Sequence, residues 1–335
     1  MQVTTDTTTY VVDALGFDIS LVLRPSLEHP GVEIVMHGAD FDLRLLRRDL
    51  GIRLSCLFDT QIAAALLGRE SLGLAALLQD YYGITLSKKH QRADWAMRPL
   101  TEGMLEYAAA DTQYLRELSV QMRTELRAKG REAWLVEECR ALEESSSSRQ
   151  ESERIDPVTR VKGARELRPR QVTALRRALQ WRDQLAMAKD KALFRIVGDG
   201  PLLEAVVMNP HRPQELLEIK GFPEGLARNN GADLVQIVGS VARLQESELQ
   251  SYPSRPRDKS RRPTPEAEAL LDELKVVRNA QAKELGIARG TLLSNAVLSE
   301  VARAAPKDLD SLAAVTGMRR WKIEAVGESL LEVIH

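Results

Sequence analysis

A tyrosine and an aspartate stand four residues apart in the stretch EYAAADTQYL, and only alanines separate Tyr107 from Asp111. On a helix, residues at i and i+4 lie on the same face, about one turn apart. The small side chains between them leave room for something wide to approach that face. A buried tyrosine beside a solvated acid is the simpler interpretation of such a pair taken alone.

Further acids stand where the predicted strands end. Asp42 comes just after the short apolar strand EIVM, at the start of a helix, and Asp59 closes the strand LFD. Carboxylates that converge at one edge of a sheet suit divalent cations, and a pair of such ions can hold both the attacking and the leaving oxygen of a phosphodiester. Asp40 competes with Asp42 for this role. For Asp59 we expect an N-cap of the next helix rather than a metal ligand.

The framework for these residues is a front segment in which strand and helix patterns alternate. QVTT and TTYVVDAL predict a β-hairpin with Asp6 and Thr7 in its turn, and GVEIVMHG and SCLFDT predict two short strands. Helices are expected over FDLRLLRRDLG, ending at Gly51, over QIAAALLG, and as one long helix from an N-cap at Thr101 to a stop at Gly130. This alternation predicts an α/β sheet.

Beyond Pro157 the strand patterns stop, and the chain predicts helices that repeat at a shift of 96 residues. Several glycines, prolines and leucines keep one register, which predicts two copies of a small helical domain. In this register the residues Pro210, Gly221, Gly231 and Leu234 correspond to Pro306, Gly317, Gly327 and Leu330.

Two polar segments separate these parts. Residues 143–160 are rich in Ser and Glu, and residues 251–265 are rich in Pro and Arg, which is typical of linkers. The second segment carries five basic residues that could touch phosphate, although a solvated linker is the simpler interpretation. The predicted domains are therefore residues 1–142, 161–243 and 266–335.

Composition narrows the class of protein. The 335 residues include only two cysteines, and the chain has no apolar run of about 18 residues and no signal-peptide pattern, so we expect a cytoplasmic protein outside the membrane. Residues 1–150 carry 17 Lys and Arg against 22 Asp and Glu, and residues 151–335 carry 30 against 26. An acidic front and a mildly basic rear are weak evidence for a metal-using site followed by an anion-binding region.

Four ordered segments, HGADFDLRLLRRDLG, LFDTQIAAALLG, KKHQRADWAMRPL and YAAADTQYL, closely resemble ribonuclease D. This is a family of 3′–5′ exoribonucleases with the DEDD exonuclease fold, in the subclass that carries a tyrosine. The helical repeat resembles the helicase-and-RNase-D C-terminal (HRDC) domain, the first copy more closely than the second. The resemblance implies an α/β ribonuclease H-like exonuclease domain followed by two all-α HRDC-like domains.

The resemblance also implies roles for matching residues. Asp42, Tyr107 and Asp111 would be catalytic: Asp111 a direct metal ligand, Asp42 a ligand through water, and Tyr107 the residue that orients the attacking water. The intact family fold holds two Mg²⁺ or Mn²⁺ ions at this site. The alanines beside Tyr107 would then admit metal and scissile phosphate.

Other positions of the resemblance concern the substrate. Lys88 and Arg98 are expected to contact it, because phosphate contacts are usually made by basic side chains. His37 is a further candidate, with packing at its strand end as the simpler interpretation. Trp95 is expected in the core.

One motif of the family is absent from the sequence. The family has an Asp-x-Glu strand just upstream of the strand that reads QVTT here, and no such motif precedes it. That strand is central in the family's sheet, so we expect a sheet without its central strand and too few carboxylates for two-metal chemistry. A start codon placed too late, a fragment, or an evolved pseudo-nuclease would each explain the absence.

Three hypotheses about function follow. The first is an exoribonuclease that trims single-stranded 3′ ends of RNA, including transfer RNA precursors, to nucleoside 5′-monophosphates. The second is a non-catalytic nucleic-acid-binding protein, and the third is a protein-interaction scaffold. Steep salt dependence of RNA binding would separate the second from the third.

Overall fold

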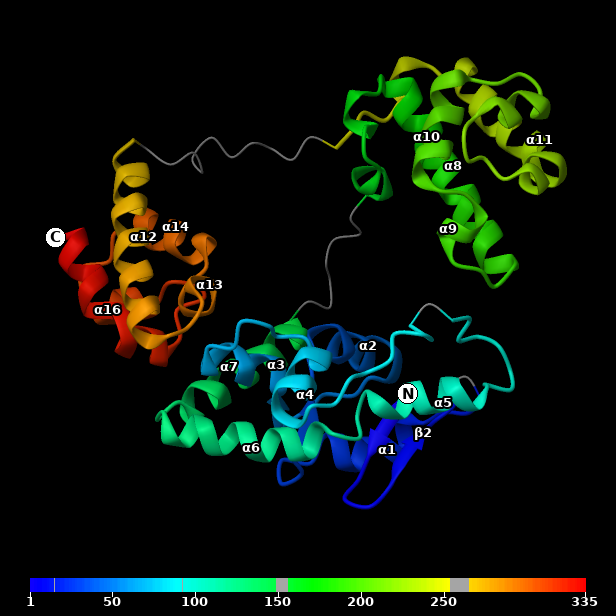
Figure 1. The fold of residues 1–335 in the computed structure, drawn as a ribbon. Coiled ribbons are helices and arrows are strands. Elements are labelled where there is room, and N and C mark those ends of the chain that lie inside the picture. The colour runs from blue at the N-terminus through cyan, green and yellow to red at the C-terminus, as the bar shows by residue number, and fades with distance from the viewer. Residues whose placement is uncertain (15, 92, 149–155, 254–264) are drawn as a thin grey trace. The chain divides into compact units, whose positions relative to one another are not determined.

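The structure is a computed structural model, and it describes residues 1–14, 16–91, 93–148, 156–253 and 265–335 (Figure 1). The chain divides into two compact units: unit 1 comprises Met1–Gln150 with Arg262–His335, and unit 2 comprises Glu151–Arg261. Unit 1 thus combines the front segment with the second helical copy, and unit 2 holds the first copy. No helix in the described residues is long and apolar enough to cross a membrane.

Four short strands form two separate pairs in the described part of unit 1. The predicted hairpin pairs β1 (Gln2–Thr4) with β2 (Thr9–Val11), which lies alongside α5 in Figure 1. The strands β3 (Ile34–Met36) and β4 (Leu57–Asp59) pair in parallel. No ladder joins the two pairs within the described ranges.

Seven helices in the described front segment surround these strands. The helix α2 ends at Gly51 in a left-handed conformation (φ 63°), as the sequence predicts, because glycine adopts positive φ at no steric cost. The helices are α1 (Ser20–Leu27), α2 (Asp40–Leu50), α3 (Thr60–Leu67), α4 (Leu74–Tyr82), α5 (Glu102–Ala110), α6 (Leu115–Ala128) and α7 (Glu132–Ser148).

The single long helix expected between Thr101 and Gly130 is divided into α5 and α6. Thr101 is the predicted N-cap, and Gly130 has the predicted positive φ of 67°. Between the two helices, the N–H groups of Asp111 and Leu115 each donate to the carbonyl three residues earlier rather than four. Such tighter bonds close one helix and begin another in a new direction. The last helix of this part, α7, extends to Ser148 and so into the segment expected to be a linker.

The second helical copy packs against the front segment within unit 1, and its helix α16 contacts α7. The rings of Trp134 on α7 and Trp321 on α16 stack with centroids 4.5 Å apart. Glu137 accepts hydrogen bonds from the backbone N–H groups of Arg320 and Trp321, the first two residues of α16. A carboxylate at a helix N-terminus satisfies donors that the helix itself leaves unpaired. The helices of this copy are α12 (Pro265–Leu285), α13 (Arg289–Leu292), α14 (Asn295–Ala304), α15 (Leu309–Ala313) and α16 (Arg320–Ile334).

Gly68 lets the backbones of the front segment and the second copy meet. A Cβ atom on Gly68, which caps α3, would lie 1.9 Å from the carbonyl oxygen of Gly286, so any side chain there would force the segments apart. Nearby, the buried Arg131 donates to the carbonyls of Leu66 and Leu285 and thus bridges the front segment and the second copy.

Unit 2 has its own core and the same helical order as the second copy, at the predicted shift of 96 residues. Each copy also turns at a glycine with positive φ, Gly221 (82°) or Gly317 (93°). The α-helices of unit 2 are α8 (Pro169–Ala188), α9 (Leu193–Ile196), α10 (Asp199–Met208) and α11 (Glu224–Ser240), and its short 3₁₀ turns are η2 (Pro157–Arg160), η3 (Ala164–Glu166), η4 (Pro213–Glu218), η5 (Val241–Arg243) and η6 (Glu246–Glu248).

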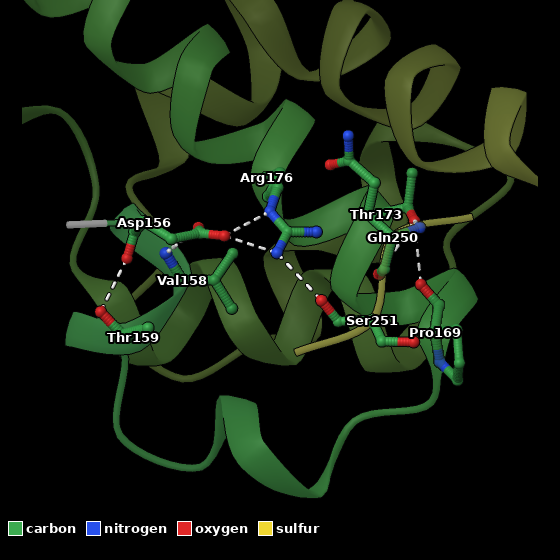
Figure 2. Close-up of polar contacts among 8 residues, drawn as sticks. All are labelled: Asp156, Val158, Thr159, Pro169, Thr173, Arg176, Gln250 and Ser251. Carbon is green, nitrogen blue, oxygen red and sulfur yellow. Dashed lines mark hydrogen bonds and ion pairs between the residues drawn. The ribbon is translucent and has the colours of Figure 1, made fainter. Parts of the chain in front are cut away.

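The two ends of unit 2 meet on α8 (Figure 2). The guanidinium of Arg176 donates to the Asp156 carboxylate (2.8 and 2.5 Å) and to the carbonyl of Ser251 (3.0 Å). One turn earlier, the hydroxyl of Thr173 accepts from the N–H of Gln250 (2.8 Å). The residues Asp156–Arg160, expected at the end of the first linker, therefore belong to the folded unit. The five basic residues of the second segment, Arg255, Arg257, Lys259, Arg261 and Arg262, lie outside the described residues.

Candidate active site

A buried carboxylate organises the turn that leads into α2. Asp59, 1% exposed, caps α3 as predicted by accepting from the N–H groups of Gln61 and Ile62. It also accepts from the N–H groups of Gly38 (3.1 Å) and Ala39 (2.7 Å), which form the turn after β3. One side chain therefore holds the start of α2 against the start of α3. The sequence pattern predicts the cap of α3 but not the bonds to the turn before α2.

Asp42 lies in the first turn of α2, where the helix dipole favours a carboxylate. Partial burial raises the pKa of Asp42, and the charge of Asp59 raises it further. The competing residue, Asp40, is instead paired with Arg44 one turn along the helix (2.5 Å). The structure thus leaves Asp42 as the better candidate, because the Asp40 carboxylate already has a cationic partner.

Tyr107 and Asp111 lie at the end of α5. Asp111 is the C-cap of the helix and keeps helical dihedral angles, so the one-turn spacing to Tyr107 holds. Burial raises the pKa of Asp111, and burial together with the Asp111 charge raises the pKa of Tyr107. The neighbouring hydroxyl of Thr112 is 2.8 Å from that of Thr4, which ties the end of α5 to the strand β1.

Two aromatic rings lie beside the ring of Tyr107. The Trp95 ring is 5.9 Å from it, and the His90 ring is 6.5 Å from it in an edge-on arrangement. Gly103 makes room, since a Cβ atom there would lie 2.9 Å from Nε2 of His90. Trp95 is half-buried and was expected in the core; its contact with Tyr107 makes it part of this cluster. His90 was not among the sequence candidates, and its place in KKHQRADW is the signal that could have found it.

The predicted substrate contacts have different surroundings. His37 is half-buried, with Nδ1 2.9 Å from the Thr60 hydroxyl, which itself donates to the carbonyl of Met36. The Nδ1 of His37 is therefore the donor, and Nε2 is left as an acceptor. Burial lowers the pKa of His37, so the ring is neutral at pH 7.

Of the two basic candidates, Arg98 is already engaged. Its guanidinium makes two hydrogen bonds of 2.7 Å to the Asp13 carboxylate, so a phosphate would have to displace that acid. Lys88 is exposed, and within the described ranges its ammonium has no ion pair. The structure therefore favours Lys88 over Arg98 as a site for phosphate.

The carboxylates supply oxygen ligands of the kind that hard cations prefer, but they are few. Across the described ranges, no three His, Cys, Asp or Glu side chains form a group that could hold a metal ion. Asp42 and Asp111 by themselves do not complete a two-ion site.

Comparisons with known proteins identify both the front segment and the two helical copies. Residues 1–127 match a family model described as 3′–5′ exonuclease, and residues 171–238 and 267–334 match the HRDC domain. A ribonuclease D of Pseudomonas paraeruginosa is 30% identical over 315 residues, which cover 92% of this chain and 80% of that protein.

Solved structures are similar over nearly the full length. A protein from Bifidobacterium adolescentis aligns with a TM-score of 0.75 at 26% identity, over 96% of this chain and 82% of that one. The RNase D of Escherichia coli, described as an exoribonuclease involved in structured RNA processing, aligns with a TM-score of 0.65 at 25% identity, over 99% and 87%.

Proposed function

This chain belongs to the ribonuclease D family of 3′–5′ exoribonucleases, and we propose that it shortens single-stranded 3′ ends of RNA, transfer RNA precursors among them, in the cytoplasm. The observation that carries the proposal is the placement of Tyr107 and Asp111 on one face at the end of α5, with only alanine between them. In the proposed complex, a phosphodiester would lie against both groups. A non-catalytic binding protein is the less favoured alternative, since the family consists of enzymes.

The family depends on divalent metal ions, which polarise a phosphoryl oxygen and supply a hydroxide nucleophile when bound. We propose Asp111 and Asp42 as this chain's ligands to Mg²⁺ or Mn²⁺. Their raised pKa values fit such a role, because a nearby cation would offset the cost of partly desolvated carboxylates. The described residues by themselves do not complete a two-ion site.

Tyr107 acts as a hydrogen-bond donor in this proposal. Its pKa is raised by burial and by Asp111, so the phenol keeps its proton at neutral pH and cannot serve as a base. It would orient a water molecule or a phosphate oxygen beside Asp111. The rings of Trp95 and His90 lie beside the phenol. Lys88 would contact the phosphate backbone, and His37 would accept a hydrogen bond from substrate through Nε2.

The test is a ladder assay on a 5′-labelled RNA with a single-stranded 3′ tail, in Mg²⁺ or Mn²⁺. The proteins are this chain, a version extended upstream in frame, and Asp111→Asn in whichever form is active. We expect stepwise shortening that Asp111→Asn abolishes. Stepwise shortening that survives Asp111→Asn would contradict the assigned role of Asp111. Binding without shortening by either version would support the binding-protein alternative.

A further inference from the structure

Unit 2 carries an exposed apolar cluster beside a cavity. The side chains of Met187, Leu193 and Phe194 are 82%, 42% and 74% exposed, at the end of α8 and on α9. Leu193 and Phe194 also line a cavity of about 310 Å³, which is at the small end of the range for small-molecule sites. An aromatic ring exposed to this extent loses hydrophobic stabilisation unless something covers it.

The second helical copy shows that the fold does not require this cluster. At the shift of 96 residues, the three positions are occupied by Lys283, Arg289 and Gly290, all exposed. The helix that carries Arg289 and Gly290, α13, forms without the apolar side chains, so they are not needed for folding. The difference therefore points to a ligand of unit 2 alone.

The polar groups of the two copies differ at the same place. In each copy a buried arginine donates through Nη1 to a backbone carbonyl 15 residues on, Arg182 to Val197 and Arg278 to Leu293. In the second copy, the Nε of Arg278 also donates to the side chain of Asn279 (2.9 Å). In unit 2 that neighbour is an aspartate.

This aspartate, Asp183, lines the cavity without an internal partner. Within the described residues, its carboxylate makes no hydrogen bond or ion pair, and the buried Nε of Arg182 has none either. Arg182 is 7% exposed and lines the same cavity. The buried Nε of Arg182 is thus left without the acceptor that Asn279 supplies in the second copy, while the half-buried Asp183 carboxylate stands beside it. Unsatisfied buried polar groups are costly in a fold, and they are common where a ligand completes the pairing.

Basic and acidic side chains both surround the cavity. Arg160 lines it and is exposed, and Lys191 and Arg195 stand beside Leu193 and Phe194. The acid Asp199, also in the lining, is neutralised by Arg182 (2.6 Å). Aromatic faces combined with basic side chains are the pattern by which proteins bind single-stranded nucleic acid.

We propose that this cavity holds one nucleobase of single-stranded RNA. The base stacks on Phe194, its exocyclic amine donates to Asp183, and the adjacent phosphate lies against Arg160. A carboxylate accepts from the N4 amine of cytosine, whereas uracil has a carbonyl at that position, so cytosine is preferred over uracil. The choice of RNA as ligand rests on the proposed function. Unit 2 then binds the RNA at a single, base-specific site.

The experiment measures RNA affinity of the full chain by fluorescence anisotropy in EDTA, with labelled oligo(C) and oligo(U). Phe194→Ala should weaken oligo(C) binding at least about fivefold, since stacking contributes substantially per base, and Phe194→Trp should retain it. Leu193→Ala should weaken binding, whereas the matched control Leu217→Ala, at a leucine of similar exposure (45%) elsewhere in unit 2, should not. Asp183→Ala should bring the affinities for oligo(C) and oligo(U) together.

Unchanged binding in Phe194→Ala would overturn the proposal. So would full binding by Phe194→Leu, which keeps an apolar surface without a ring and would point to a protein partner instead. Equal affinities of the unmodified chain for the two oligonucleotides would refute the contact of Asp183 with the base. Because binding is read without metal, a chain that binds as expected but does not trim RNA counts against the proposed chemistry and leaves the cavity assignment standing.

Discussion

Removing the Asp59 carboxylate should destabilise unit 1 strongly. In Asp59→Ala the N-cap of α3 is lost, at about 1 kcal/mol. The N–H groups of Gly38 and Ala39 are also left without their acceptor, at roughly 1–3 kcal/mol each. The expected loss is therefore about 3–7 kcal/mol, a large part of a typical domain stability of about 5–15 kcal/mol.

The isosteric variant Asp59→Asn separates the two halves of this role. Its remaining oxygen can accept from Gly38 and from the first turn of α3, but its amide group would face the N–H of Ala39. We expect a loss of about 2 kcal/mol, clearly smaller than that of Asp59→Ala. The measurement is urea unfolding followed by tryptophan fluorescence, with linear extrapolation to water.

Asp40→Ala is the matched control, because Asp40 is an exposed acid beside the same turn whose pair with Arg44 contributes at most about 0.5 kcal/mol. If Asp59→Ala lost no more stability than Asp40→Ala, the four backbone contacts of Asp59 would not hold the two helices together. The start of α2 would then be positioned by contacts other than those of Asp59.

Three further predictions concern other parts of the chain. Trp321→Ala should destabilise unit 1 by about 3–5 kcal/mol in urea unfolding, since it removes a buried ring and its bond to Glu138; a loss below 1 kcal/mol would mean that the contact of α16 with α7 contributes little. Burial raises the pKa of Asp111 in the folded protein above its value in the unfolded chain, so the free energy of unfolding falls as pH rises from the unfolded pKa to the folded pKa. Without metal, Asp111→Asn removes the buried charge, so it should raise Tm at pH 7 and raise it less toward pH 4. An equal advantage at both pH values would refute this titration. Arg176→Ala should raise hydrogen exchange at both ends of unit 2, because its guanidinium binds Asp156 and the carbonyl of Ser251; exchange raised at one end only would show that the two ends are held independently.

Local chemistry made the front segment predictable. The N-cap at Asp59, the end of α2 at Gly51 and the turn of the hairpin each follow from neighbouring residues, and all three are present. The helical repeat was also visible, because matched residues keep one register across 96 positions. These features depend on sequence neighbours within a few residues or on comparison within the chain.

Other features depend on contacts between residues far apart in the sequence, and no local sequence pattern predicts them. The helix was expected to run through Asp111, since its composition favours a helix, and the turn there lies where Thr112 meets β1. The second set of bonds to Asp59 joins residues about 20 positions apart. The partner of Trp134 lies in another domain, and an apolar period shows only that a face is buried, not what covers it.

The meeting of both ends of unit 2 at Arg176 has a consequence for the order of folding. The second copy must reach α7 across the whole length of unit 2, a separation of more than a hundred residues between Ser148 and Pro265. Once unit 2 has folded, its ends at Asp156 and Ser251 are already together, and the chain left to close is several times shorter. Loop closure costs about 0.6 kcal/mol per doubling of length, so prior folding of unit 2 lowers the entropic cost of assembling unit 1 by roughly 1.5 kcal/mol. The contacts of Arg176 thus shorten the loop that must close before the second copy packs on the front segment.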